Sequence, residues 1–191
     1  MSILPPPTAG FDLNVPILIV GAGACGLVAA LAANDAEAEV LVVEADAAPS
    51  GSTALSAGLI PAAGTRFQRD AGIEDTADLF AKDIQKKAKG ENPQELVDLL
   101  AGQSGKVIEW LADRFGLPFS VVTDFDYPGH SRRRMHGLPT RAGRELIDRL
   151  RTACEAQGID IICNRRATSL FVEGDHVRGV RLEGPNGTED V

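Results

Sequence analysis

A glycine-rich turn that directly follows a short apolar run constrains the fold of this chain most. Ile17 to Val20 is a continuous run of branched apolar residues, typical of a strand buried on both faces in a parallel sheet. The turn Gly21-Ala22-Gly23-Ala24-Cys25-Gly26 follows at once. Residues 24–35 are small or good helix formers, and Asn34-Asp35 supplies a stop. We therefore expect a strand, a tight turn and a helix in immediate succession.

These glycines and a later acid predict a dinucleotide site. In this context the glycines permit a tight turn, close approach of a pyrophosphate and close packing of helix on strand. The start of the helix favours an anion because its first N–H groups lack partners. Residues 40–43 predict a second buried strand, and Glu44 and Ala45 follow it, where a carboxylate accepts hydrogen bonds from an adenosine ribose. The candidate contacts are Gly21, Ala22, Gly23, Ala24, Cys25, Gly26, Glu44 and Ala45, with Cys25 interpreted as a small helix residue rather than a redox thiol.

The next segment bears on which dinucleotide binds, since FAD and a nicotinamide share the ADP half. Residues 49–64 are rich in Ser, Thr, Gly and Ala, and predict an extended loop. Within it, Ser50-Gly51-Ser52-Thr53-Ala54-Leu55-Ser56-Ala57-Gly58-Leu59-Ile60 resembles the second flavin motif of the fumarate reductase and succinate dehydrogenase flavoprotein family, which includes ketosteroid dehydrogenases. The resemblance implies FAD, with contacts along the pyrophosphate and towards the isoalloxazine from Ser52, Thr53, Ser56, Ala57 and Gly58. A flexible linker is the alternative.

The resemblance covers nearly the whole chain. It continues through residues 92–119 and 143–180, and the segment Asn164-Arg165-Arg166-Ala167-Thr168 implies a main-chain contact from Ala167 to adenine. Two departures are Ser50 in place of a glycine, and Glu37 near the position of another. No histidine lies between Ser52 and Gly58, where respiratory members attach FAD covalently, so we predict noncovalent FAD.

The elements together predict an α/β fold: a three-layer FAD/NAD(P)-binding Rossmann-like domain with a parallel sheet, a helical insertion and a β-meander. We expect a single FAD-binding domain over residues 1–191, with a disordered lead at 1–14 and the helical insertion at about 70–118. Helices are predicted at 76–89 and 92–115. The second would have Asn92 as N-cap, Pro93 at the first helical position and an apolar stripe of Leu96, Leu100, Val107 and Leu111.

The remaining elements complete this expectation. A short strand is predicted within 117–125, a loop at 127–138 and a helix from about Thr140 that ends near Gly158. Three strands follow at 159–163, 168–172 and 177–182, the last two joined as a hairpin. A final turn at Gly184 to Gly187 should send the chain back along this hairpin.

Composition excludes several classes of protein. The chain has 19 Lys and Arg against 27 Asp and Glu, a net charge of −8 that argues against nucleic acid as a partner. No apolar run is long enough for a membrane span, and the start lacks the order of a secretory signal, so we expect cytoplasmic residence. Cys25, Cys154 and Cys163 form no metal spacing and predict no disulfide framework.

Candidates for catalysis are few. His130, His136 and Arg132 to Arg134 share one loop, which is either a pocket for an anionic substrate or a solvated basic surface. Four positions after Tyr127 stands Ser131 rather than lysine, which weakens the interpretation as a short-chain dehydrogenase. No serine lies in the Gly-x-Ser-x-Gly turn of a serine hydrolase. We therefore assign no catalytic residue and no metal.

The resemblance also implies where catalysis would lie. In the family this region leads into a substrate-capping domain and a catalytic arginine, so we expect those beyond Val191 and this chain alone to be inactive. The leading hypothesis is part of an FAD-dependent oxidoreductase acting on a C–C bond next to a carbonyl or carboxylate of a small-molecule substrate, anionic or steroid-like. The alternatives are an NAD(P)-binding Rossmann enzyme and a noncatalytic FAD-binding fragment. The electron partner stays open.

Overall fold

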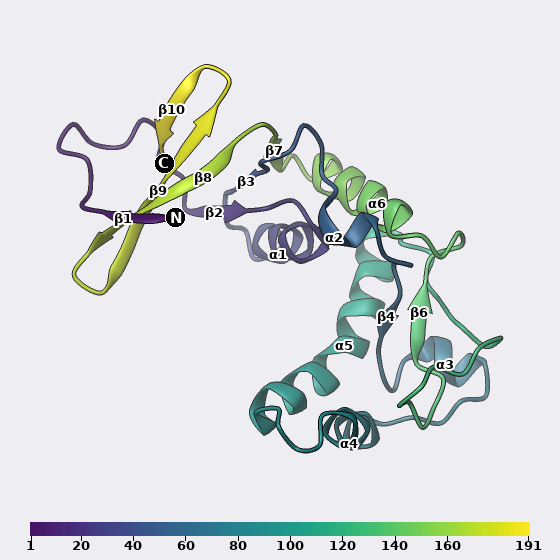
Figure 1. Cartoon of the computed structure of the whole chain (residues 1–191). Helices are drawn as coiled ribbons and strands as arrows, with labels where there is room; N and C mark the ends of the chain where they lie inside the picture. The colour runs from purple at the N-terminus through teal and green to yellow at the C-terminus, as the bar shows by residue number, and fades with distance from the viewer. The chain divides into compact units, whose positions relative to one another are not determined.

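The computed structural model describes all 191 residues, and its internal contacts divide the chain into two compact units. Unit 1 comprises Met1–Leu55 and Leu146–Val191, and unit 2 comprises Ser56–Glu145 (Figure 1). We describe each by itself. The predicted helical insertion lies within unit 2, whereas the extent of a single domain stays a prediction.

Unit 1 is built on a parallel sheet, as predicted. Its strands are β2 (Ile17–Val20), β3 (Val40–Val43) and β7 (Asp160–Ile162), in the order β2-β3-β7. Helix α1 (Ala24–Asp35) connects β2 to β3, and α6 (Gly143–Ala156) precedes β7. All four residues of β3 are buried, because a strand between two neighbours and two covering layers has no face towards water.

A second sheet in unit 1 is the predicted meander. It contains β1 (Ser2–Leu4), β8 (Arg166–Glu173), β9 (His176–Gly184) and β10 (Gly187–Asp190), in the order β1-β8-β9-β10. The predicted hairpin between β8 and β9 and the return of the chain as β10 are both confirmed (Figure 1). The prediction of a disordered lead is wrong for Ser2–Leu4, because this strand pairs in parallel with β8. Its partner is distant in sequence, so local composition carried no sign of it.

Side chains of β3 join the layers of unit 1. Leu41 and Val43 pack with Val180 and Leu182 of β9. Since side chains alternate along a strand, Val40 and Val42 face the opposite side, where α1 covers the sheet. Helix α6 lies beside α1, with the Cys154 Sγ 3.6 Å from the Leu27 carbonyl oxygen. The order of helices, parallel sheet and meander confirms the three-layer α/β prediction.

Unit 2 is centred on two helices that pack against each other, α4 (Ala77–Lys87) and α5 (Gln94–Phe115) (Figure 1). Both helices were predicted, but the prediction of which face of α5 is buried was wrong. Its buried residues are Val97, Ala101, Gly105, Ile108 and Leu111. Of the predicted stripe only Leu111 is buried, whereas Leu96 is 61% and Leu100 52% exposed. A Cβ at Gly105 would lie 2.5 Å from the Ala63 oxygen, so close backbone approach fixes which face turns inward.

The start of α5 also differs from prediction. Pro93, not Asn92, is the N-cap, and no side chain caps this end. Helix α3 (Arg66–Asp70) was not predicted, although Thr65 and Gln68 form a complete capping box there. A helix of five residues leaves too little apolar periodicity to be recognised.

Short elements replace two predicted loops. The prediction of an extended loop at 49–64 is wrong where α2 (Gly51–Ala54) and β4 (Ile60–Pro61) form. The prediction of a loop at 127–138 is wrong where β6 (Met135–Gly137) forms. The strand predicted within 117–125 is confirmed only as β5 (Ser120–Val121). These strands form an antiparallel sheet in the order β4-β6-β5. Each pairs over two residues only, which leaves no alternation to read from sequence.

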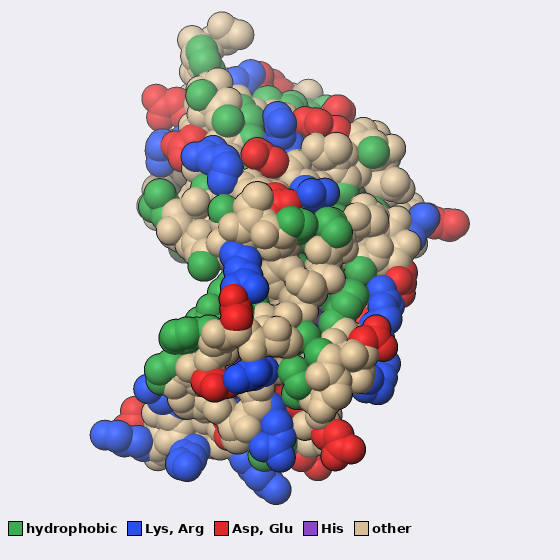
Figure 2. Space-filling view, turned by 90° about the vertical axis from the view of Figure 1, so that its right-hand side faces the viewer, with side chains coloured by type: hydrophobic (Ala, Val, Ile, Leu, Met, Phe, Trp, Pro, Cys, Tyr) green, Lys and Arg blue, Asp and Glu red, His purple; other side chains and the backbone are tan.

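The surface carries charged side chains of both signs, as the composition of 19 Lys and Arg and 27 Asp and Glu leads one to expect. On the face shown in Figure 2, acidic and basic side chains are interspersed with apolar ones. None of the helices combines the length and the apolar character that a membrane span requires.

Candidate nucleotide-binding site

The carboxyl ends of the three parallel strands of unit 1 lie at one edge of the sheet, where α/β folds bind nucleotides. The Gly21 N–H, directly after β2, donates to the Val43 oxygen at 2.7 Å. The Glu44 N–H, directly after β3, donates to the Ile162 oxygen of β7 at 2.9 Å. Main-chain hydrogen bonds therefore hold together the glycine turn, Glu44 and the residues after β7.

The glycine turn has the geometry that a bound pyrophosphate needs. Gly21 has φ +102°, a conformation that L side chains rarely adopt. A Cβ on Gly26 would lie 1.9 Å from the Gly21 oxygen, so any side chain there would force strand and helix apart. At Gly23 a Cβ would meet only the Thr53 Oγ1, at 3.9 Å. The first and third glycines are thus required by the fold, and the second leaves space beside the helix end.

The N-terminus of α1 is open to an anion. Its N-cap is Gly23, which has no side chain to cap the helix. The Ala24 N–H donates to Thr53 Oγ1 at 3.3 Å, which brings the predicted contact Thr53 to the glycine turn. Ser52 lies in the same short helix and is exposed, as is Cys25 in the first turn of α1. The partial positive charge of the helix start and the hydroxyl of Thr53 therefore lie together, with the exposed Ser52 next to Thr53 in sequence.

Glu44 is held in place before any ligand arrives. Its Oε2 accepts from the Ala22 N–H at 2.7 Å and its Oε1 from the Asp46 N–H at 2.9 Å. A carboxylate has about four lone-pair sites, so each oxygen keeps capacity for a ribose hydroxyl. Burial, reinforced by the negative charge of Glu44, raises the pKa of the nearby Cys163 thiol, which stays protonated at neutral pH.

The residues after β7 complete this edge. Asn164, at φ +56°, donates its N–H to the Asp46 oxygen at 3.0 Å, and the Arg165 N–H donates to the Glu44 oxygen at 2.8 Å. Ala167 follows in β8 with its side chain packed against the core, which leaves only main-chain groups for a ligand. Sequence reasoning missed Asp46, because its role comes from a main-chain bond to Asn164 that no local pattern reports.

The remaining predicted contacts, Ser56, Ala57 and Gly58, belong to unit 2. The Ser56 oxygen accepts from the Gly143 N–H at 2.8 Å, and its Oγ accepts from the Gly58 N–H at 3.0 Å. Gly58 has φ +62°, and a Cβ there would lie 2.9 Å from the Ala142 oxygen. Gly58 is therefore required by backbone packing, while Ser56 and Ala57 are exposed.

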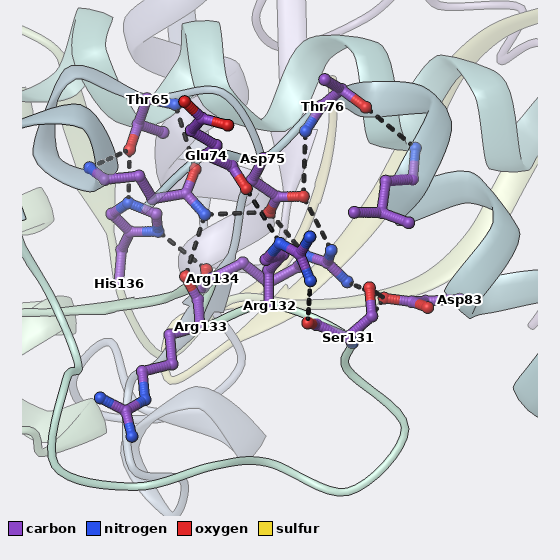
Figure 3. A network of polar contacts seen from close by, with 12 residues as sticks. Thr65, Glu74, Asp75, Thr76, Asp83, Ser131, Arg132, Arg133, Arg134 and His136 are labelled. Atoms are coloured by element: carbon purple, nitrogen blue, oxygen red, sulfur yellow. Dashed lines mark hydrogen bonds and ion pairs between the residues drawn. The ribbon is translucent and has the colours of Figure 1, made fainter. Parts of the chain in front are cut away.

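Two residues of the basic loop, Arg134 and His136, belong neither to a substrate pocket nor to a solvated surface, the two arrangements considered from sequence. The Arg134 side chain is wholly buried and binds Asp75 through two hydrogen bonds of 2.9 Å, with a further bond to Asp83 (Figure 3). Burial alone would raise the pKa of Asp83, but hydrogen bonds from Ser131 and Arg134 hold it below its usual range. His136 is also wholly buried. These groups stabilise unit 2 and are closed to substrate.

The other members line an open cavity of about 570 Å³ in unit 2. Arg133 pairs with the exposed Asp126 at 2.7 Å. Arg132 donates to the main-chain oxygens of Glu74 at 3.1 Å and Ser131 at 2.9 Å. Acidic and basic groups share the wall, so its charge does not single out an anion. No group of His, Cys, Asp and Glu side chains has the arrangement of a metal site.

Comparison with known proteins identifies the family. A sequence profile described as "FAD binding domain" matches residues 16–191. The chain belongs to this family. This membership decides for FAD between the two cofactors that the glycine turn left open. The residues fit that cofactor, because the glycines, the start of α1 at Gly23 and the carboxylate of Glu44, already held by two N–H groups, suit its ADP half.

Named relatives of this FAD-binding domain are reductases. "Probable fumarate reductase Ifc3" of Shewanella frigidimarina is 37% identical over 172 residues, which are 88% of this chain and 28% of that protein. The solved open conformation of a flavocytochrome c3 fumarate reductase has a TM-score of 0.87 at 34% identity, over 95% of this chain and 32% of that one. A 3-ketosteroid-Δ4-(5α)-dehydrogenase from Rhodococcus jostii RHA1 shares the fold, with a TM-score of 0.81 at 21% identity over 98% and 46% of the chains. The FAD-binding domain thus spans less than a third of the fumarate reductases it matches.

Proposed function

We propose that this FAD-binding domain serves an oxidoreductase that adds or removes hydrogen across a carbon–carbon bond next to a carboxylate or carbonyl. The observation that carries the proposal is the edge where Gly21, Glu44 and Asn164 meet, in a chain 37% identical to a named fumarate reductase. Bound FAD would supply hydride transfer. The residues of this chain would bind and orient it.

Each predicted contact has a role in this proposal. The N–H groups of the glycine turn and the start of α1 hold the pyrophosphate, with hydroxyls from Ser52 and Thr53. Glu44 accepts hydrogen bonds from the ribose, and a main-chain group of Ala167 contacts adenine. Ser56, Ala57 and Gly58 serve the isoalloxazine end. The absence of histidine from Ser52 to Gly58 supports noncovalent attachment.

A small dicarboxylate is the substrate class best supported, because the relative at 37% identity and the solved structure at 34% identity are both named as fumarate reductases. A steroid has only the likeness of fold in its favour. We also propose cytoplasmic residence, which three free cysteines suit.

Cofactor binding is tested on this chain by purification with FAD and an absorption spectrum. We expect the visible bands of oxidised flavin, and release of all flavin into the supernatant after acid precipitation. Flavin retained in the precipitate would contradict noncovalent attachment. Colourless protein that binds NADH instead would contradict the proposed role.

Catalysis is tested on the polypeptide that contains this chain. The assay follows oxidation of a reduced artificial electron donor by fumarate, with succinate and a dye oxidant for the reverse direction. We expect turnover that depends on added FAD after the cofactor has been removed. Full flavin loading without turnover of any unsaturated acid or ketone would favour a noncatalytic FAD-binding protein.

A further inference from the structure

His136 joins β6 to the start of α3 through a contact that fixes the tautomer of its ring (Figure 3). Its Nδ1 lies 2.9 Å from the Arg134 carbonyl oxygen, which can only accept, so Nδ1 carries the proton. Its Nε2 lies 2.8 Å from the Thr65 Oγ1. In the neutral ring Nε2 is an acceptor, and the Thr65 hydroxyl therefore donates to it.

The same hydroxyl begins α3. Thr65 Oγ1 accepts from the Gln68 N–H at 3.1 Å, and Gln68 Oε1 accepts from the Thr65 N–H at 3.2 Å. The Gln68 side chain also donates to Asp75 and to the Arg133 oxygen, both at 2.9 Å. A helix of five residues has little stability of its own, so its position depends on these contacts.

Charged groups face His136 from three elements. Asp75, in the segment after α3, and Glu109, on α5, favour a protonated ring. Asp75 is already bound to Arg134 of β6, and Glu109 accepts from the Arg66 N–H at 2.5 Å. Burial outweighs these acids and the main-chain groups of Arg134 and Ile60 that also favour the protonated ring, and it lowers the pKa of His136.

We propose that the contact between Thr65 and His136 is an acid-sensitive latch, which holds α3 against β6 while the ring is neutral. Protonation turns Nε2 from an acceptor into a donor. The Thr65 hydroxyl then loses the acceptor for its own proton at a buried position, which is costly. Acid thus weakens the capping box and the attachment of α3.

The direction with pH follows from proton linkage. The folded ring has a pKa below its unfolded value of about 6.5, so the unfolded state takes up the proton first. The stability that the latch contributes is complete above pH of about 6.5 and declines as the pH falls towards the folded pKa.

The first test is an NMR titration of the full chain, with amide hydrogen exchange measured at Gln68 and Arg69. We expect a His136 ring protonated on Nδ1 with a midpoint below about 6.5. The opening constant of these amides, corrected for intrinsic exchange, should rise by up to about tenfold per pH unit as the pH falls from about 6.5 to that midpoint, and should level off below it. A ring protonated on Nε2, a midpoint of about 6.5 or higher, or pH-independent opening would each overturn the latch.

The second test uses variants. His136→Gln keeps an uncharged acceptor and should abolish the pH dependence of opening. Two control variants should leave that dependence intact. His176→Gln changes an exposed hairpin residue, and His130→Gln removes another histidine whose pKa is lowered by burial. If His136→Gln does not fold, Thr65→Ser should retain the pH dependence and Thr65→Val should lose it. Unchanged dependence in His136→Gln or Thr65→Val would refute the proposal.

Discussion

The nucleotide edge of unit 1 and the buried network of unit 2 are both dense in polar groups, yet they differ in what those groups can still bind. At the nucleotide edge, Gly23 offers α1 no side-chain cap, and each carboxylate oxygen of Glu44 accepts one N–H. In the network, Arg134 is bound to two carboxylates and has no exposed surface. Unused hydrogen-bonding capacity, rather than charge, therefore distinguishes the ligand site from the structural one.

The largest effect should come from breaking the structural network. Arg134→Met leaves Asp75 without its cationic partner at a buried position, and should lower the free energy of unfolding by about 3–5 kcal/mol. Chemical denaturation measures the change. Arg133→Met, which removes an exposed pair with Asp126, is the control and should change stability little. Equal losses in the two variants would show that burial of Arg134 does not matter.

The next largest effect should come from filling the glycine turn. Gly26→Ala places a Cβ 1.9 Å from the Gly21 oxygen and should lower the free energy of unfolding by about 1–3 kcal/mol. The variant should also lose FAD during gel filtration. Gly102→Ala is the matched control, because no atom lies within 4 Å of its Cβ in α5. That change should stabilise the chain by about 0.5–1 kcal/mol. Normal FAD binding by Gly26→Ala would contradict the assigned turn.

A smaller effect is expected at the ribose contact. Glu44→Gln replaces an oxygen that accepts hydrogen bonds with an NH₂ group, and should weaken FAD binding by about tenfold, or about 1.4 kcal/mol. Titration calorimetry of the flavin-free chain measures the affinity. Glu39→Gln changes an exposed acid just before β3, and its affinity should match that of the unaltered chain. A loss shared by both variants would point to net charge instead.

The smallest effect should be a gain in stability. Glu37 has φ +61° after the end of α1, near a position where the resembled family has glycine. Glu37→Gly removes the left-handed strain but gives the unfolded chain more freedom, so the net gain should be about 0.5–1 kcal/mol. Thermal unfolding of the two chains checks this. A lower midpoint for the glycine variant would mean that the Glu37 side chain contributes contacts.

The same contrast explains how far the sequence could predict the molecule. The turn from Gly21 to Gly26 and the position of Glu44 depend on neighbours in sequence, and both lie where the pattern indicates. The contact between Asp46 and Asn164 joins segments distant in the chain, as does the burial of Arg134 by Asp75 and Asp83. Local pattern therefore located the glycines and strands. It could not show which loop residues would be buried or which face of α5 would turn inward.

The pairing of β3 with β7 has a consequence for synthesis on the ribosome. Strands β2 and β3 emerge early, but their neighbour β7 and the Ile162 oxygen that receives the Glu44 N–H emerge only after all of unit 2. Strand β1 waits longer still, since Ser2 meets Ser169 across 167 positions. The nucleotide edge is therefore completed only after unit 2 has been synthesised, and unit 2 has time to fold before the cofactor can be captured.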